Sequence, residues 1–391
     1  MASIPLVVVQ LLLLLLPLPL REHLWSSQHR RNDVDAGELH PIIVLPGVAC
    51  SDLEARLTEA YRPSAARCGA MKGKGWFPLW KNSSDLSTHR YNECFEEQMS
   101  LVYDPVANDY RNFPGVETRV PYFGLVKGYH QKWPFDKPWC LTPLIRALEE
   151  MGYRDGDNMH GAPYDFRHVP PVPGQESRVY SRYYKEFMEL VEATSKRHRK
   201  KKVIILGHSH GGCVALEFVR NTPLAWRKEY IKHLFLVTPT LSAGLLDPAG
   251  GEPCHRAAQP VLRARRDGAV AAANVEELRD QHRQPPVPGR VRARANRGHR
   301  AEELLRRTPR QLVYWDGNFD EAPERVYGDG DGIVNLVTML AFDEEMRRQP
   351  GQRGQFKSIK VENASHMGIL MDEWVLKRVM QEILEVNQDS S

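Results

Sequence analysis

The sequence predicts an α/β fold, in which a mostly parallel β-sheet carries helices on both faces. Short runs of apolar, often β-branched residues alternate with longer segments whose apolar residues recur at helical spacing. A strand of a parallel sheet is buried on both faces and therefore forms a continuous apolar run, and its alternation with helices is typical of this fold class. The 391 residues suffice for one large domain or for a core with a lid.

Residues 1–25 predict a signal peptide or a retained N-terminal anchor, because residues 4–20 are almost wholly apolar but short for a membrane span. Either interpretation places the protein in the secretory pathway: secreted, vacuolar or lysosomal, or membrane-associated. The six cysteines would then act as staples, and the sequons at Asn82 and Asn363 fit glycosylation there. The net charge of +4 is too weak to indicate nucleic-acid binding.

Residues 40–47 predict a first buried strand that ends in a Pro-Gly turn, and residues 53–57 look helical. Residues 58–138 lack regular periodicity and are rich in aromatic residues. A Cys68–Cys94 disulfide would close a loop around Trp76 and Trp80. Two interpretations remain: a lid whose exposed aromatics face lipid, or a buried irregular subdomain. The aromatic residues in question are Trp76, Phe77, Trp80, Trp133, Phe135 and Trp139.

Two helices are predicted in the middle of the chain. Residues 142–151 form the first, with Thr142 as N-cap and Pro143 in the first turn. Residues 175–195 form the second, which carries Tyr183, Phe187, Leu190 and Val191 on one face. The basic residues 197–202 suit the end of that helix, and contact with anionic lipid is a weaker alternative.

The most informative stretch is residues 203–212, Val-Ile-Ile-Leu-Gly-His-Ser-His-Gly-Gly. It predicts a buried strand, a sharp turn and the start of a helix. Gly207 and Gly211 bracket Ser209 in a G-x-S-x-G pattern, which presents a nucleophilic serine at the tip of such a turn. An ordinary glycine-rich turn is the alternative. The flanking His208 and His210 are poor candidates for the base, because their side chains generally point away. Cys213 is expected to be a buried free thiol.

Residues 233–237 predict another strand, after which the composition changes. No aromatic residue occurs between positions 236 and 313, where Arg, Ala, Pro, Gln and Gly dominate. Residues 241–307 therefore predict a degenerate or disordered cap, with short helices at most at 275–278 and 301–307. GC-rich coding sequence translated in the wrong reading frame tends to have this amino-acid composition. The abrupt return to normal composition at Thr308 favours that explanation.

The last part of the chain supplies two further candidates for catalysis. We expect strands at 311–315 and 356–361 and a closing helix at 373–385. The order Ser209, Asp331, His366 is the chain order of the serine, acid and base in α/β-hydrolases, and each residue lies beside a predicted strand end. Asp329 is the rival acid. The aspartate pair lacks the further acids of a calcium loop, so no metal is expected.

These motifs together resemble the lecithin–cholesterol acyltransferase and lysosomal phospholipase A2 family, most of all its plant lecithin–cholesterol acyltransferase-like members. The resemblance implies an α/β-hydrolase core over residues 38–240 and 308–386, with a lid or membrane-binding insertion in 58–138. It also implies oxyanion-hole N–H groups at Ala49 and His210 and a lid disulfide between Cys68 and Cys94. The matching stretches are 40–47, 53–55, 114–121, 161–167, 203–212, 328–335 and His366.

The resemblance implies an enzyme without cofactor or metal. Ser209 would take an acyl group from a glycerophospholipid at a membrane or lipid-particle surface and pass it to a sterol or another alcohol. A phospholipase A or lipase that uses water as acceptor has the same catalytic residues. The chain departs from the family after Val237, where Ala-Pro-Trp-Gly-Gly is replaced by Thr-Pro-Thr-Leu-Ser. The second family disulfide has no evident partners either. An inactive relative that has lost its cap is therefore a third hypothesis.

Overall fold

A computed structural model describes residues 39–80, 92–129, 132–133, 137–138, 140–171, 175–240, 307–313, 324–349 and 355–389. Several expectations lie outside these residues: the leader at 1–25, the sequon at Asn82, Phe135 and Trp139, and the predicted cap except Arg307. Within the described residues, no helix has the length and apolar character needed to cross a membrane.

The centre of the molecule is a parallel sheet, as the sequence predicts. Four strands lie in the order β11-β10-β1-β9, and all described pairings between them are parallel. Every residue of β1 and β10 is buried. Side chains of consecutive residues point to opposite faces of the sheet. Because both faces are covered, the strands are unbroken apolar runs. The strands are β1 (Ile42–Leu45), β9 (Met159–Gly161), β10 (Val203–His208) and β11 (Ile231–Val237).

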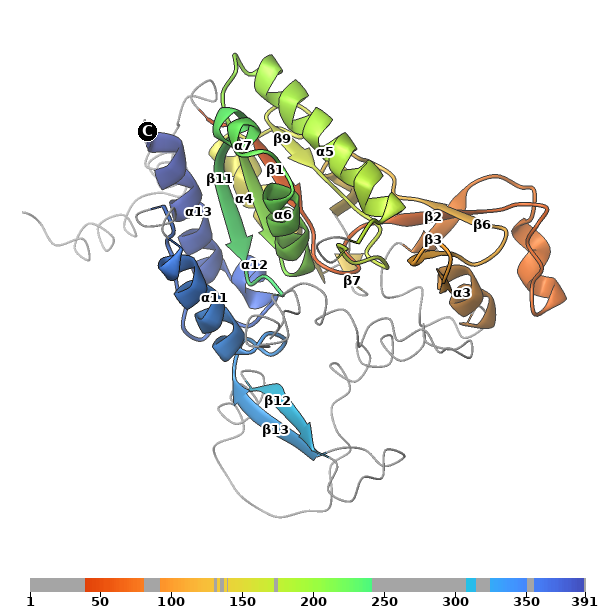
Figure 1. The fold of residues 1–391 in the computed structure, drawn as a ribbon. Helices are drawn as coiled ribbons and strands as arrows, with labels where there is room; N and C mark the ends of the chain where they lie inside the picture. Colours follow the sequence, from red (N-terminus) through yellow and green to blue (C-terminus); the bar gives the residue numbers. More distant parts are fainter. Residues whose placement is uncertain are drawn as a thin grey trace, which may run out of the picture.

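Helices cover both faces of the sheet (Figure 1). One face packs on α4 (Thr142–Met151), α12 (Gly368–Met371) and α13 (Glu373–Gln388). The other packs on α5 (Arg178–Arg197) and α6 (His210–Arg220), with α7 (Leu224–Tyr230) against them. The α/β-hydrolase-like class is thereby confirmed.

The helices at 142–151, 175–195 and 373–385 form where the sequence predicts them, with small shifts at their ends. Thr142 is the first helical residue rather than the N-cap, and its hydroxyl donates to the carbonyl of Tyr129 at 3.3 Å. Tyr183, Phe187 and Val191 are buried on α5, as expected from their spacing.

Residues 53–57 form a strand, so the helix expected there is wrong. Leu53, Ala55 and Leu57 are buried while the residues between them face outward, and this period of two belongs to a strand with one covered face. The strand, β2 (Leu53–Leu57), is the middle of an antiparallel sheet with β3 (Phe77–Trp80) and β6 (Val116–Arg119).

The described residues of the segment 58–138 share a separate core with β2. Trp80 is only 4% exposed and packs with Leu79, Tyr61 and Val116, so the exposed-lid interpretation is wrong for this residue. Trp76 and Phe77 are half-buried. The other elements are η2 (Ala66–Met71), α3 (Asn92–Met99), β4 (Leu101–Asp104), β5 (Asp109–Asn112), η4 (Lys127–Tyr129), β7 (Lys132–Trp133) and β8 (Lys137–Pro138).

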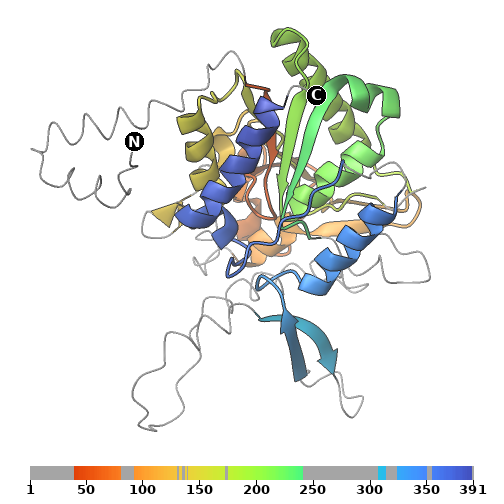
Figure 2. The same cartoon turned by 90° about the vertical axis from the view of Figure 1, so that its left-hand side faces the viewer.

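The C-terminal part differs from expectation in its strands. β12 (Arg307–Val313) pairs antiparallel with β13 (Glu324–Asp329), in a two-stranded sheet apart from the central one (Figure 2). Arg307 is thus in a strand, not at the end of a helix. The strand expected at 356–361 has no partner among the described residues, and its residues are mostly exposed. Within the described residues, β11 therefore pairs with β10 alone. It is mostly half-buried instead of buried. The helix α11 (Leu336–Arg348) follows β13.

Two disulfides join described residues. Cys68 is bonded to Cys94, the pair that the resemblance implies. Cys50 is bonded to Cys140, a pair not predicted from the sequence. The expected free thiol at Cys213 is wrong: Cys213 is buried but disulfide-bonded, and no described cysteine is free. Burial alone does not distinguish a thiol from a half-cystine, because both are apolar.

Candidate active site

Ser209 lies on a sharp turn between β10 and α6. Its backbone has φ 55° and ψ −127°, a conformation that non-glycine residues rarely adopt. The turn needs glycine around it because the backbones approach closely. A Cβ on Gly207 would lie 2.4 Å from the carbonyl oxygen of Gly211, and one on Gly211 would lie 2.3 Å from that of Pro46. Gly207 is thus required by the close approach of the start of α6, and Gly211 by that of the end of β1.

The structure brings three residues from distant parts of the chain together. The Oγ of Ser209 lies 2.8 Å from Nε2 of His366, and Nδ1 of the same ring lies 2.7 Å from Oδ2 of Asp331. Ser209 and His366 are 8% and 4% exposed. A buried imidazole between a hydroxyl and a carboxylate can accept a proton from the first while the second holds its tautomer.

The surroundings of Asp331 favour the ionised form of its carboxyl group. Burial by itself would raise its pKa, but the hydrogen bonds from His366 and from the backbone N–H groups of Val334 and Ile333 bring the pKa below its ordinary value. The rival Asp329 is exposed at the end of β13. Of the two aspartates, Asp331 is therefore the one in contact with His366.

His208, which its place beside Ser209 makes a poor candidate for the base, is a further residue of the site with no role predicted from sequence. It is 1% exposed, and its Nε2 lies 3.2 Å from the backbone carbonyl oxygen of His366. Burial, together with the neighbouring His366, lowers the pKa of His208 to about 3. The ring is therefore neutral, with Nε2–H as the donor. A histidine directly before the serine was the only available signal.

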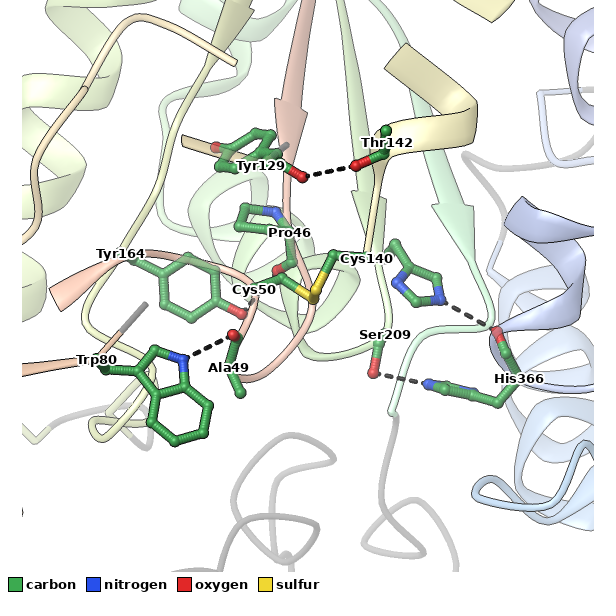
Figure 3. Close-up of a disulfide and its surroundings, with 11 residues drawn as sticks. Pro46, Ala49, Cys50, Trp80, Tyr129, Cys140, Thr142, Tyr164, Ser209 and His366 are labelled. Atoms are coloured by element: carbon green, nitrogen blue, oxygen red, sulfur yellow. Dashed lines mark hydrogen bonds between the residues drawn. A yellow bond between two sulfur atoms is a disulfide. The ribbon is translucent and has the colours of Figure 1, made fainter. Parts of the chain in front are cut away.

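The expected oxyanion residues lie on two sides of the turn. Ala49 has φ 64° in the loop after β1, and His210 is the first residue of α6. This loop lies close to the serine, since a Cβ on Gly47 would be 3.2 Å from Cβ of Ser209. In the view of Figure 3, Ala49 and His366 lie on opposite sides of Ser209. Backbone N–H groups at a helix start carry partial positive charge that favours an anion.

No group of three or more His, Cys, Asp or Glu side chains in the described residues could hold a metal ion. The second sequon residue, Asn363, is exposed in the turn before His366 with φ 63°.

Comparison with known proteins gives consistent results. The family model described as lecithin:cholesterol acyltransferase matches residues 76–245. The chain is 34% identical to a lecithin-cholesterol acyltransferase-like 1 of Oryza sativa subsp. japonica, over 90% of this chain and 88% of that protein. The corresponding protein of Arabidopsis thaliana is 32% identical over 90% of this chain and 91% of its own length. Human lysosomal phospholipase A and acyltransferase is 27% identical over 50% of this chain and 46% of its own.

Proposed function

The chain belongs to the lecithin:cholesterol acyltransferase family, and from this premise we propose that it is a serine acyltransferase acting on glycerophospholipid esters. Relatives named as acyltransferases and as a phospholipase A support a lipid acyltransferase or phospholipase activity. The proposal assigns Ser209 as nucleophile, His366 as general base and Asp331 as the acid that orients the base.

The observation that carries this proposal is the continuous hydrogen-bonded chain from the Ser209 hydroxyl through His366 to Asp331, with contacts of 2.8 and 2.7 Å. The first contact is within the range needed for transfer of the Ser209 proton to His366 in a substrate complex. The second is a hydrogen bond that orients the His366 ring.

In the acylation step, His366 Nε2 takes the proton of Ser209 as Oγ attacks the carbonyl carbon of the phospholipid ester. The carbonyl oxygen becomes an oxyanion, for which the N–H groups of Ala49 and His210 are the proposed donors. When the tetrahedral intermediate collapses, the ester C–O bond breaks and His366 returns the proton to the leaving oxygen. A lysophospholipid departs, and the acyl group stays on Ser209.

In the second step, His366 removes a proton from the acceptor hydroxyl, whose oxygen attacks the acyl-enzyme. Collapse releases the new ester, and the proton returns to Ser209 Oγ. The proposed acceptor is a sterol or another alcohol. Water in the same position gives a free fatty acid, and the likeness to a lysosomal phospholipase A and acyltransferase favours keeping this as the second candidate.

The protein would meet its substrate at a membrane or lipid-particle surface in the secretory pathway. Two disulfides between described cysteines support this compartment, since such bonds persist where conditions are oxidising.

The test is to incubate the full chain with phosphatidylcholine vesicles that carry a labelled acyl chain, with and without sterol. Labelled sterol ester supports acyl transfer, and labelled fatty acid in both samples supports the hydrolase. A Ser209→Ala variant is the control for either product. Absence of both products from a folded wild-type chain would favour the third hypothesis, an inactive relative.

A further inference from the structure

The loop after β1, residues 46–50, is held by side chains from three distant parts of the chain; we call it the oxyanion loop. Tyr164 donates its O–H to the carbonyl of Pro46 at 2.9 Å. Trp80 donates its indole N–H to the carbonyl of Ala49 at 2.9 Å. Cys50 is bonded to Cys140, 90 residues away. Figure 3 shows Trp80, Tyr164 and the disulfide grouped around the loop.

These anchors fix the one residue of the loop whose conformation is unusual. Ala49 has φ 64°, a left-handed conformation that an alanine keeps only where its surroundings enforce it. The bond from Trp80 holds the Ala49 carbonyl, and the disulfide holds the next residue. The Cys50 N–H donates to the carbonyl of Gly47 at 3.2 Å and closes a turn over residues 47–50. The middle peptide of this turn carries the Ala49 N–H, so anchoring the Ala49–Cys50 peptide also restricts the direction of that N–H.

Trp80 itself is rigidly placed. It is 4% exposed, and its ring centroid lies 5.7 Å from that of Phe166 and 6.3 Å from that of Phe95. It is the last residue of β3, within the segment that the Cys68–Cys94 disulfide closes. Strand β3 thus contacts, through Trp80, the backbone of the loop that follows β1 of the central sheet.

We propose that Trp80 is a positioning residue for acyl transfer. Its indole N–H holds the Ala49–Cys50 peptide, and the turn over residues 47–50 then directs the Ala49 N–H at the developing oxyanion. Through Trp80, strand β3 is thereby part of the machinery that stabilises the transition state. The proposal rests on the proposed function, since it takes Ser209 as the nucleophile and Ala49 as an oxyanion donor.

Replacement of Trp80 by phenylalanine tests the proposal, because it keeps an aromatic ring and removes the N–H. A soluble short-chain substrate, p-nitrophenyl butyrate, avoids effects on lipid-surface binding. We expect kcat to fall about tenfold with KM changed less than about twofold, because a donor displaced in the transition state leaves ground-state binding intact. The rate of Ser209 phosphonylation by a small fluorophosphonate, whose P=O occupies the same site, should fall by a similar factor.

The matched control is Trp226→Phe. Trp226 on α7 also donates its indole N–H, to Glu192 Oε1 at 2.7 Å. It precedes the start of β11, whereas Ser209 follows the opposite end of the parallel neighbour β10. The Trp226→Phe variant should keep the wild-type kcat and phosphonylation rate. If Trp80→Phe does not fold, incorporation of 3-benzothienyl-alanine at position 80 removes the N–H and retains the bicyclic shape.

A wild-type kcat and phosphonylation rate in a folded position-80 variant would overturn the positioning role. A higher KM with an unchanged kcat would also overturn it, because Trp80 would then affect only substrate binding. The Ser209→Ala variant separates this result from failure of the proposed function. If that variant retains turnover, the nucleophile assignment fails. If it is inactive while the position-80 variant is normal, only the role of Trp80 fails.

Discussion

His366 and Asp331 are joined by two contacts, one through side chains and one through the backbone. The ring Nδ1 lies 2.7 Å from Oδ2 of Asp331, and the backbone N–H of His366 donates to the carbonyl of Asp331 at 2.8 Å. The second contact fixes the two loops against each other, although 35 residues separate them. The imidazole therefore keeps its orientation without substrate, with Nε2 directed at Ser209.

Replacement of Ser209 by alanine should abolish acyl transfer and hydrolysis, with a fall in kcat of roughly 10⁴-fold or more. The fold should be retained, because the turn depends on the neighbouring glycines and the change removes only one oxygen. Activity against labelled phospholipid and the thermal midpoint measure the two effects. Retained esterase activity would remove the nucleophile assignment.

Asp331→Asn should lower kcat by roughly 10⁴-fold, because an amide favours the wrong histidine tautomer. Asp329→Asn is the matched control at an exposed position two residues away and should have a much smaller effect. Comparing kcat of both variants on one substrate decides between them. The reverse order would assign the acid role to Asp329.

The neutral, buried His208 should make the protein less stable in acid. The pKa of His208 is about 3 in the folded protein, whereas its ordinary value is 6.5. Between these two pH values the histidine is protonated in the unfolded chain but stays neutral in the folded one. The contribution of His208 to the free energy of unfolding is therefore complete above pH 6.5 and is lost progressively as the pH falls toward 3.

The variant His208→Gln tests this, because a glutamine amide can donate to the His366 carbonyl and does not titrate. We expect its thermal midpoint to fall less than that of the wild type between about pH 7.5 and about pH 5. Equal declines in both proteins would show that other groups, such as the buried His168, cause the acid sensitivity.

Loss of the Cys50–Cys140 disulfide should destabilise the fold more than loss of the Cys68–Cys94 disulfide. Their sequence separations are 90 and 26, for which chain entropy gives about 4.5 and about 3.5 kcal/mol. Denaturant unfolding of the two double alanine variants measures the difference. A larger loss from the shorter loop would contradict this entropic account.

Arg167 should be essential for stability, since it is 3% exposed and joins the subdomain to the core. Its guanidinium contacts Asp165 at 2.6 Å and also reaches Asn112 and Thr118 at 2.8 Å. Arg167→Ala leaves the Asp165 carboxylate, whose side chain is only 12% exposed, without its partner and should cost about 3–5 kcal/mol. Arg347→Ala, which breaks an exposed ion pair on α11, should change the thermal midpoint little. Similar effects of the two variants would refute the prediction.

The amino-acid sequence alone determined the features that depend on local pattern. The apolar run of β10, the glycines around Ser209 and the spacing of α4 and α5 all follow from short-range sterics and periodicity. The chain order of Ser209, Asp331 and His366 predicted which residues come together, because it is the order of serine, acid and base in α/β-hydrolases.

Only the tertiary structure decided which distant partner each residue meets. Residues 53–57 became a strand because β3 and β6 pair with them, while residues 356–361 have no such partner among the described residues. Cys50, Trp80 and His208 each make their contact with a segment far away in the chain. No local pattern encodes such contacts, since the free energy that selects them comes from packing and backbone pairing in the assembled fold.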